Sequence, residues 1–290
     1  MSPAFAAFIA PARPRCALWR TVLALVLVIA IGMALQLGAF AALRLAFGWP
    51  DEAAAAHLVT QDRPWAVLVL LSGFLPIAAA ALIVTRVVLW RSPRTLWGEG
   101  WTVDFLRAIL TMGLITAAVM LWPRDQDWPR ARMPVLTWLA WLPLAILLIA
   151  GQTLAEELIF RGMMMQQLAA RFPRQTAVWM LVPALVFGAA HYMPGMGAIT
   201  PLSMGYAAIF GLLAADLVRR TGNLGAAWGM HLANNVTAIA LFSSQDQLDG
   251  LALFKGTADP EAILAQPWLA LPELLPVLAA WAILRRPARR

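Results

Sequence analysis

Charged side chains are scarce in this sequence. Of its 290 residues, 13% are charged and 61% are hydrophobic, whereas a soluble globular domain carries about 25% charged and roughly 45–50% apolar residues. The mean hydropathy of +0.72 over the whole length leaves no room for a sizeable soluble domain. These values exclude a soluble enzyme, a disordered chain and a DNA-binding domain, and they predict a protein that resides in a lipid bilayer.

Lysine and cysteine are almost absent. Lys255 is the one lysine among 22 basic residues, and Cys16 is the one cysteine, so no disulfide can form within the chain. A net charge of +7 on a soluble domain would suggest a nucleic-acid partner. Here the arginines form short clusters between apolar runs and 14 tryptophans lie mostly near the ends of these runs. Both features are typical of membrane anchors, and no nucleic acid is expected to bind.

A membrane-spanning helix needs about 20 mostly apolar residues. Runs near this length cover residues 21–40, 65–85, 108–123, 133–155, 175–190, 192–215, 221–245 and 262–284. We therefore expect an all-α fold, a polytopic membrane helix bundle of about eight transmembrane helices, with residues 1–290 as a single integral-membrane domain. The first run is longer than the 7–15 apolar residues of a signal peptide, which favours a retained anchor.

The distribution of arginine predicts the orientation. With a cytoplasmic N-terminus and eight spans, 16 basic residues fall on the inner side and 6 on the outer side. This agrees with the positive-inside rule and predicts that the N- and C-termini are cytoplasmic. The composition, rich in alanine and arginine, favours a GC-rich bacterial genome and therefore a bacterial inner membrane.

Ionisable side chains inside an apolar run are costly and mark candidate functional sites. The fourth run closes with Glu156 and Glu157, followed by Arg161. On a helix, Glu157 and Arg161 share a face and can neutralise each other. Glu156 lies about 100° round the helix and keeps a free carboxylate that can accept a proton from water. The alternative is that both glutamates cap the span at the inner headgroup layer.

Two histidines mark the later runs. His191 ends the fifth run, and an isolated histidine at such a place is usually interfacial. His231 and Asn235 share a helix face in the seventh run, where they either act in a site or form interhelical hydrogen bonds. Gly225 and Gly229 in the same run predict a close approach to a neighbouring helix.

The depths of these groups permit a common site within the bilayer. Counted from the arginines at the inner turn of residues 171–174, Glu157 and His191 lie at roughly 21 and 26 Å, if the intervening residues are helical. His231 lies at roughly 16 Å when counted from Arg220. This requires the helix that carries Glu156 to continue through Gln167, with a bend or break expected near Gly151. If the helix stops at Arg161 instead, Glu156 and His191 lie on opposite sides of the membrane.

The three groups in this order, EExxxR, FxxxH and HxxxN, resemble the motifs of the CPBP family. These are intramembrane glutamic endopeptidases that include the CAAX-processing prenyl proteases and the bacteriocin self-immunity (Abi) proteins. The resemblance covers residues 155–240 as a catalytic core region. It implies that Glu156 is the general base and that His191 helps to hold the water. His231 and Asn235 would stabilise the oxyanion, while Glu157 with Arg161 would orient the motif helix.

The expected function is therefore an endopeptidase that hydrolyses a peptide bond near the C-terminus of a membrane-embedded peptide or lipidated protein, such as a prenylated CAAX-type substrate. No cofactor is expected. Two glutamates and two histidines also make a plausible zinc set, but no HExxH helix is present, and a metal-free site is favoured. The alternatives are a non-catalytic membrane binding or self-immunity protein and a proton-coupled transporter. The natural substrate and oligomeric state remain open.

Three weaker candidates for functional sites are expected to have structural roles. Asp216, just before Arg219 and Arg220, is expected to form a local ion pair at the cytoplasmic interface. Glu273, in a run interrupted by proline, is expected to reach the interface or to pair with another helix. The methionines at 163–165 are expected to pack in the core or against lipid rather than to line a substrate groove.

Overall fold

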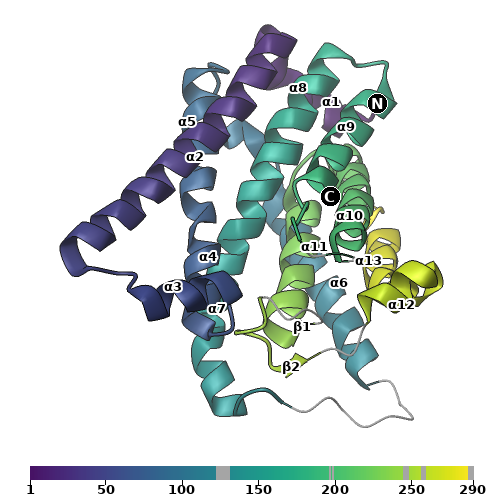
Figure 1. Cartoon of the computed structure of the whole chain (residues 1–290). Helices are drawn as coiled ribbons and strands as arrows, with labels where there is room; N and C mark the ends of the chain where they lie inside the picture. Colours follow the sequence, from purple (N-terminus) through teal and green to yellow (C-terminus); the bar gives the residue numbers. More distant parts are fainter. Residues whose placement is uncertain (122–130, 196, 198, 244–247, 256–258, 287–290) are drawn as a thin grey trace.

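The computed structural model describes residues 1–121, 131–195, 197, 199–243, 248–255 and 259–286. The chain runs up and down the molecule as a bundle of helices (Figure 1). In chain order the α-helices are α1 (Pro3–Ile9), α2 (Leu18–Phe47), α3 (Glu52–Thr60), α4 (Pro64–Ser72), α5 (Phe74–Val87), α6 (Trp101–Leu121), α7 (Val135–Glu157), α8 (Gln166–Arg171), α9 (Thr176–Ala189), α10 (Ile199–Thr221), α11 (Gly225–Asn235), α12 (Pro260–Ala265) and α13 (Leu271–Leu284).

Short elements of other kinds connect or extend these helices. The 3-10 helices are η1 (Ala10–Arg15), η2 (Pro93–Leu96) and η5 (Pro267–Ala270), and the π-helices are η3 (Leu158–Met165) and η4 (Val236–Leu241). Among the described residues the strands are β1 (Phe242–Ser243) and β2 (Phe254–Lys255), which pair in parallel with Phe242 opposite Phe254. The expected all-α bundle is confirmed.

Five helical segments are long and apolar enough to cross a membrane. They are Leu18–Phe47, Pro64–Val87, Trp101–Leu121, Val135–Arg171 and Ile199–Thr221, and the chain is a multi-pass integral membrane protein. The other three expected runs form shorter helices, namely α9, α11 with η4, and α13. Residues 122–123 and 244–245 of two expected runs lie outside the described residues. The number of eight spans therefore stays a prediction.

The outer face of α2 is apolar and exposed. Val22, Val26, Ile29 and Leu37 are 56–65% exposed, which on a soluble monomer would form an unusually large apolar patch. The opposite face of α2 carries small buried residues that pack on α5, and a side chain at Gly32 would lie 2.9 Å from Ile77. Lipid, rather than protein, is therefore the expected neighbour of the outer face.

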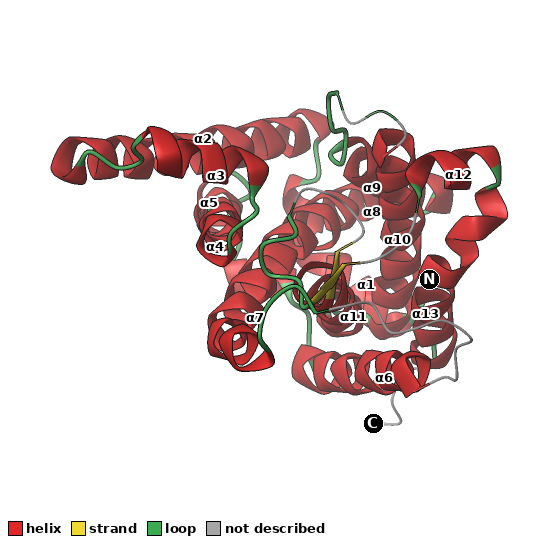
Figure 2. Ribbon diagram, turned by 60° about the horizontal axis from the view of Figure 1, so that its bottom comes forward, coloured by secondary structure: helices red, strands yellow, loops and turns green. Residues whose placement is uncertain are grey.

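Helix α11 lies at the centre of the bundle, in contact with α6, α7, α10 and α13 (Figure 2). Its two glycines permit a close approach to α6. A Cβ atom at Gly229 would lie 2.5 Å from the carbonyl oxygen of Phe105, and one at Gly225 would overlap that of Trp101. The close helix contact predicted from these glycines is confirmed, and it brings His231 into the core.

Both described ends of the chain lie at the same end of the bundle. The Ser2 hydroxyl donates a hydrogen bond to the Arg219 carbonyl over 3.3 Å, at the end of α10. The Arg107 guanidinium, in the second turn of α6, donates to the carbonyls of Ile283 and Arg286 over 3.2 and 2.6 Å. Helix α10 ends where α6 begins, because the backbone N–H of Leu224 donates to the Trp97 carbonyl over 2.9 Å. The N-terminal helix and the end of α13 therefore share one side.

The helix that carries Glu156 is continuous from Val135 to Arg171, over 37 residues. At a rise of about 1.5 Å per residue it is roughly 55 Å long, more than the bilayer core requires. The expected continuation through Gln167 is confirmed. The expected break near Gly151 is wrong, because the α-helical pattern passes through this residue, and Gly151 serves instead as a contact point for Leu75.

Candidate active site

The two glutamates end α7, immediately before the π-helical segment η3. Glu157 is fully buried, whereas the side chain of Glu156 retains 13% exposure. A π-helix closes i→i+5 hydrogen bonds, so it changes the angular relation of the side chains on either side of it, and such segments are frequent at functional sites. The irregularity of this long helix thus lies directly after the glutamates, not before them.

Glu157 and Arg161 form the ion pair that their spacing predicts. Nη1 of Arg161 donates to Oε1 of Glu157 over 3.0 Å, and the side chains are 1% and 0% exposed. The Arg161 guanidinium also lies 4.7 Å from the ring centroid of Phe187, a cation–π contact. A charge pair in so dry a place depends on its partners, because an unpaired buried charge is very costly.

His231 lies between the two carboxylates. Its Nδ1 is 2.9 Å from Oε1 of Glu157, and its Nε2 is 3.3 Å from Oε2 of Glu156. A ring nitrogen faces each glutamate, so the orientation of the imidazole is set from both sides. Glu156 therefore has a cationic partner whenever His231 is protonated on both nitrogens, which differs from the expectation of a free carboxylate.

These four side chains form a cluster that can be electrically neutral. Glu156 and Glu157 carry two negative charges, which Arg161 and a doubly protonated His231 balance. A proton on Glu156 with neutral His231 gives the same total. Buried charges are tolerated when they are paired, so a proton can reside on either member of the Glu156–His231 pair without leaving a net charge.

Asn235 contacts α7 by a separate hydrogen bond. Its Nδ2 donates to Oε1 of Gln152 over 3.0 Å, and its Oδ1 accepts from Nδ2 of Asn234 over 3.2 Å. Oδ1 of Asn234 accepts in turn from the hydroxyl of Tyr206 on α10, over 2.8 Å. Neither Gln152 nor Tyr206 was predicted from the sequence. The signal for Gln152 was its place one helical turn before Glu156 in an apolar run.

The ring of Phe187 contacts both His191 and His231. The Phe187 ring centroid is 4.7 Å from the His191 ring and 5.8 Å from the His231 ring, both in edge arrangements. Nδ1 of His191 lies 2.8 Å from the Phe187 carbonyl, to which only an N–H can donate, so Nε2 is the acceptor in the neutral ring. The structure thus joins Glu156, Glu157, Arg161 and His231 by polar contacts. Asn235 is hydrogen-bonded to Gln152 and Asn234 instead, and His191 shares a contact with the Phe187 ring.

Arg91 supports the π-helix from the connection after α5. Its Nη2 donates to the Gly162 carbonyl over 3.3 Å, while the backbone N–H of Gln166 bonds to Met163 instead of to Gly162, its partner in an α-helix. Arg91 also donates to the side chains of Thr95, over 3.0 Å, and of Gln166. Burial lowers the pKa of Arg91 to about 10. From the sequence, Arg91 was one of the 16 basic residues expected on the inner side of the membrane, with no further role.

The weaker candidates lie outside this cluster. Asp216 accepts from Arg219 and Arg220 and from the indole of Trp281, so the local ion pair is confirmed. Glu273 is exposed on α13. The methionines at 163–165 are 0–5% exposed, which confirms core packing. Within the described ranges, no three His, Cys, Asp or Glu side chains are arranged to hold one metal ion; the metal-free site stays a prediction.

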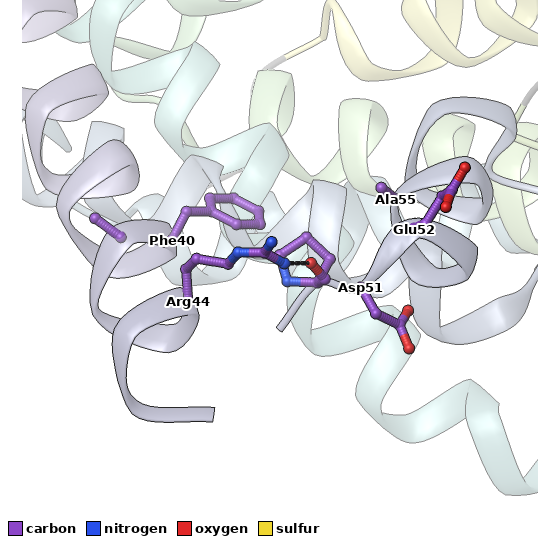
Figure 3. A pocket seen from close by; sticks show the side chains of 7 residues that line it. Phe40, Arg44, Asp51, Glu52 and Ala55 are labelled. Carbon is purple, nitrogen blue, oxygen red and sulfur yellow. Dashed lines mark hydrogen bonds between the residues drawn. The ribbon is translucent and has the colours of Figure 1, made fainter. Parts of the chain in front are cut away.

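A pocket of about 570 Å³ lies elsewhere, at the far end of α2 (Figure 3). Phe40 and Arg44 of α2 face Asp51, Glu52 and Ala55 at the start of α3. Arg44 donates hydrogen bonds to the carbonyls of Gly48, over 3.0 Å, and Pro50, and so closes the turn between the two helices. The pocket contains none of the predicted site residues.

Comparison with known proteins agrees with the resemblance of the motifs. A family model described as type II CAAX prenyl endopeptidase Rce1-like matches residues 137–237. No curated protein and no solved structure gives a significant match. The matched range contains nearly all of α7, the whole of η3 and α11, and with them every residue of the polar cluster. The resemblance of the motifs to the CAAX prenyl endopeptidases is therefore confirmed over residues 137–237.

Proposed function

We propose that this protein is an intramembrane glutamic endopeptidase in which Glu156 activates the attacking water. The observation that carries the proposal is the position of His231, whose two ring nitrogens lie 2.9 and 3.3 Å from two glutamates. Of these glutamates, Glu157 is committed to Arg161, and Glu156 is the more exposed. One carboxylate is thus structural and the other is available to a reactant.

The reaction needs a base, a held water and donors for the developing oxyanion. Glu156 takes a proton from water as the water oxygen bonds to the peptide carbonyl carbon. The carbonyl oxygen then carries the negative charge. Once Glu156 is protonated it no longer attracts the proton on Nε2 of His231, which is free to donate to that oxygen. The second N–H of the Asn235 amide is the other donor.

Collapse of this intermediate completes the hydrolysis. The C–N bond breaks as the proton on Glu156 passes to the leaving nitrogen, which gives one carboxylic acid and one amine. His191 holds the water through its Nε2 acceptor, since its Nδ1 is committed to the Phe187 carbonyl. Glu157 and Arg161 act through His231, by fixing the orientation of its ring.

The substrate follows from the family and the surroundings of the site. The Rce1-like family is described as CAAX prenyl endopeptidases, and the cluster lies among apolar helices that face lipid. We propose a prenylated C-terminal peptide, which the bilayer itself would concentrate at the enzyme. The common side of the two described chain ends, rich in arginine, is proposed to be cytoplasmic, in a bacterial inner membrane.

The test compares the purified wild type with Glu156→Gln in detergent. Internally quenched peptides with and without a prenylated C-terminal cysteine serve as substrates, each with and without a chelator. Because general-base catalysis contributes about 10²–10⁴-fold, kcat should fall by that factor in Glu156→Gln and should not respond to the chelator. Glu261→Gln removes an exposed carboxylate outside the cluster and should match the wild type.

Other outcomes would redirect the proposal. Loss of wild-type activity on chelation, restored by zinc, would replace the metal-free mechanism by a zinc site. Full activity of Glu156→Gln would remove the glutamate from the mechanism. A wild type that cleaves none of the peptides would favour a non-catalytic membrane binding or self-immunity protein.

A further inference from the structure

Three hydrogen bonds link α10, α11 and α7 in one line through the centre of the bundle. The Tyr206 hydroxyl is 2.8 Å from Oδ1 of Asn234, Nδ2 of Asn234 is 3.2 Å from Oδ1 of Asn235, and Nδ2 of Asn235 is 3.0 Å from Oε1 of Gln152. Gln152 is buried at 6% exposure, and Tyr206 and the two asparagines are half-buried. Polar groups at such positions need partners, and here each supplies one for the next.

The line has a direction. Each amide oxygen accepts from the Tyr206 side, and each amide nitrogen donates toward the Gln152 side. Gln152 lies one turn before Glu156 on α7, so this direction turns the Asn235 NH2 group toward the helix that carries the base. If the line reversed, the Asn235 oxygen would face α7 instead. An oxygen there would repel the developing oxyanion rather than stabilise it.

We propose that Tyr206 is a positioning residue that sets the direction of this line and thereby aims the Asn235 NH2 group at the reacting carbonyl oxygen. The inference rests on the proposed role of Asn235 as an oxyanion donor. Asparagine and glutamine amides can accept or donate at either end of a chain of this kind. The phenolic hydroxyl at one end can also do both, but it is the stronger donor, so its donation to Oδ1 of Asn234 favours the observed direction.

Tyr206→Phe removes this distinction with the smallest possible change of shape. Asn234 then loses the donor to its Oδ1, and the line is free to reverse. Because one neutral hydrogen bond contributes a factor of about 2–13 to an equilibrium, kcat should fall about 5-fold. KM should not change, because substrate binding does not use the hydroxyl. Asn234→Leu breaks the same line at its next member and should give a similar loss of kcat.

The chain offers a matched control, since it contains two tyrosines. Tyr192 is 62% exposed, and Tyr192→Phe should leave both kcat and KM unchanged. The apparent unfolding temperature of each variant in detergent is measured alongside. A Tyr206→Phe enzyme that loses kcat only in proportion to a loss of folded protein would overturn the proposal.

A double-mutant cycle tests whether Tyr206 acts through Asn235. Asn235→Ala alone should lower kcat by about 10²–10³, as expected for an oxyanion donor. In that background Tyr206→Phe should have no further effect. An equal 5-fold loss in both backgrounds would show that Tyr206 acts elsewhere. Should Asn235→Ala leave too little activity to measure, the comparison of kcat and KM for Tyr206→Phe and Tyr192→Phe decides.

The cycle also separates this inference from the proposed function. If Glu156→Gln abolishes cleavage and Tyr206→Phe retains wild-type kcat, the positioning role is rejected and the glutamic protease stands. If Glu156→Gln retains cleavage, the mechanism fails first, and any effect of Tyr206→Phe needs another cause.

Discussion

Two acid–arginine pairs with the same i,i+4 spacing occupy opposite environments in this protein. Glu157 and Arg161 meet over 3.0 Å with side chains 0% and 1% exposed. Asp216 and Arg220 meet over 2.6 Å with side chains 12% and 29% exposed, and Asp216 also binds Arg219 and Trp281. The first pair contacts His231 at the centre of the bundle; the second lies in the last turns of α10.

The comparison shows what helical spacing decides and what it leaves open. In both cases a spacing of four residues sets the partner, as on any helix. The neighbours then decide the consequence. Near the end of α10 the arginines reach partial exposure, so the pair is screened and replaceable. Between α7 and α11 both side chains of the Glu157–Arg161 pair are shielded from solvent. Glu157 also contacts His231 and so fixes the orientation of its ring.

The largest expected effect is the loss of one member of the buried pair. Arg161→Met leaves the Glu157 carboxylate buried without its cation, which typically costs about 3–5 kcal/mol. We expect a large drop in the apparent unfolding temperature in detergent, measured by tryptophan fluorescence. Arg220→Met is the matched control on α10 and should change stability by about 0–1 kcal/mol. Equal effects of the two variants would contradict the distinction between the pairs.

Removing both charges separates stability from activity. Glu157→Leu with Arg161→Met replaces the pair by apolar side chains of similar volume, and such replacements are often neutral or stabilising. The double variant should therefore regain most of the stability that Arg161→Met loses. Its kcat should stay at least about 10-fold below the wild type, because Nδ1 of His231 then lacks its 2.9 Å partner. Recovery of both properties would mean that Glu157 does not position His231.

The next effect concerns the close contact between α11 and α6. In Gly229→Ala the new methyl group would lie 2.5 Å from the Phe105 carbonyl, so α11 must move from α6. Overpacking of this kind typically costs about 1–3 kcal/mol, and the displacement should also lower kcat. At Gly113, on the open face of α6, an added methyl group would meet no heavy atom within 4 Å. Gly113→Ala should be stabilising by about 0.4–1 kcal/mol.

A smaller effect is expected for the partly exposed pair on α10. Asp216→Asn removes the charge that binds Arg219 and Arg220 but retains an oxygen for the Trp281 indole. Stability should change by at most about 1 kcal/mol, and peptide cleavage should be unaffected. The measurements are the unfolding temperature and kcat/KM. A loss of cleavage would assign the end of α10 a role in substrate binding.

The smallest effect is expected between α3 and α4. The hydrogen bond from His57, at 2.8 Å, holds the pKa of the Asp62 carboxyl below its usual value. The folded protein then binds this proton less readily than the unfolded chain, so the stabilisation is present above the ordinary pKa and is lost as the pH falls through the folded value. The unfolding temperatures of the wild type and Asp62→Asn should differ slightly at about pH 7 and converge as the pH falls through the lowered pKa of the folded carboxyl. Constant separation would exclude this pair as the cause.

Local patterns in the sequence predicted the parts of the site that lie on one helix. The apolar runs form helices, Glu157 forms an ion pair with Arg161, and the two glycines of α11 lie at its contact with α6. Each of these follows from the 3.6-residue period or from the size of one side chain. The expected break near Gly151 was wrong because a glycine in a helix permits close packing without interrupting the hydrogen bonds, and Leu75 occupies that position.

Contacts between helices were beyond such reasoning. Three contacts depend on how neighbouring helices are rotated. His231 faces both Glu156 and Glu157, Phe187 contacts His231 as well as His191, and Tyr206 donates to Asn234. A periodic pattern assigns a residue to a face but does not say which helix that face meets. Likewise, the sequence predicted only that Arg91 is a cytoplasmic anchor. Its hydrogen bond to the Gly162 carbonyl of the π-helix η3 depends on how the two segments pack.

By itself the sequence determined the bilayer as solvent, the all-α architecture and the identity of the polar residues within the apolar runs. These follow from composition and spacing, because a charge in an apolar helix is costly wherever the helix lies. Only the tertiary structure decided which of those residues meet. Burial and partners depend on the rotation and separation of α7, α10 and α11, and these are set by packing over the whole bundle rather than by any one segment.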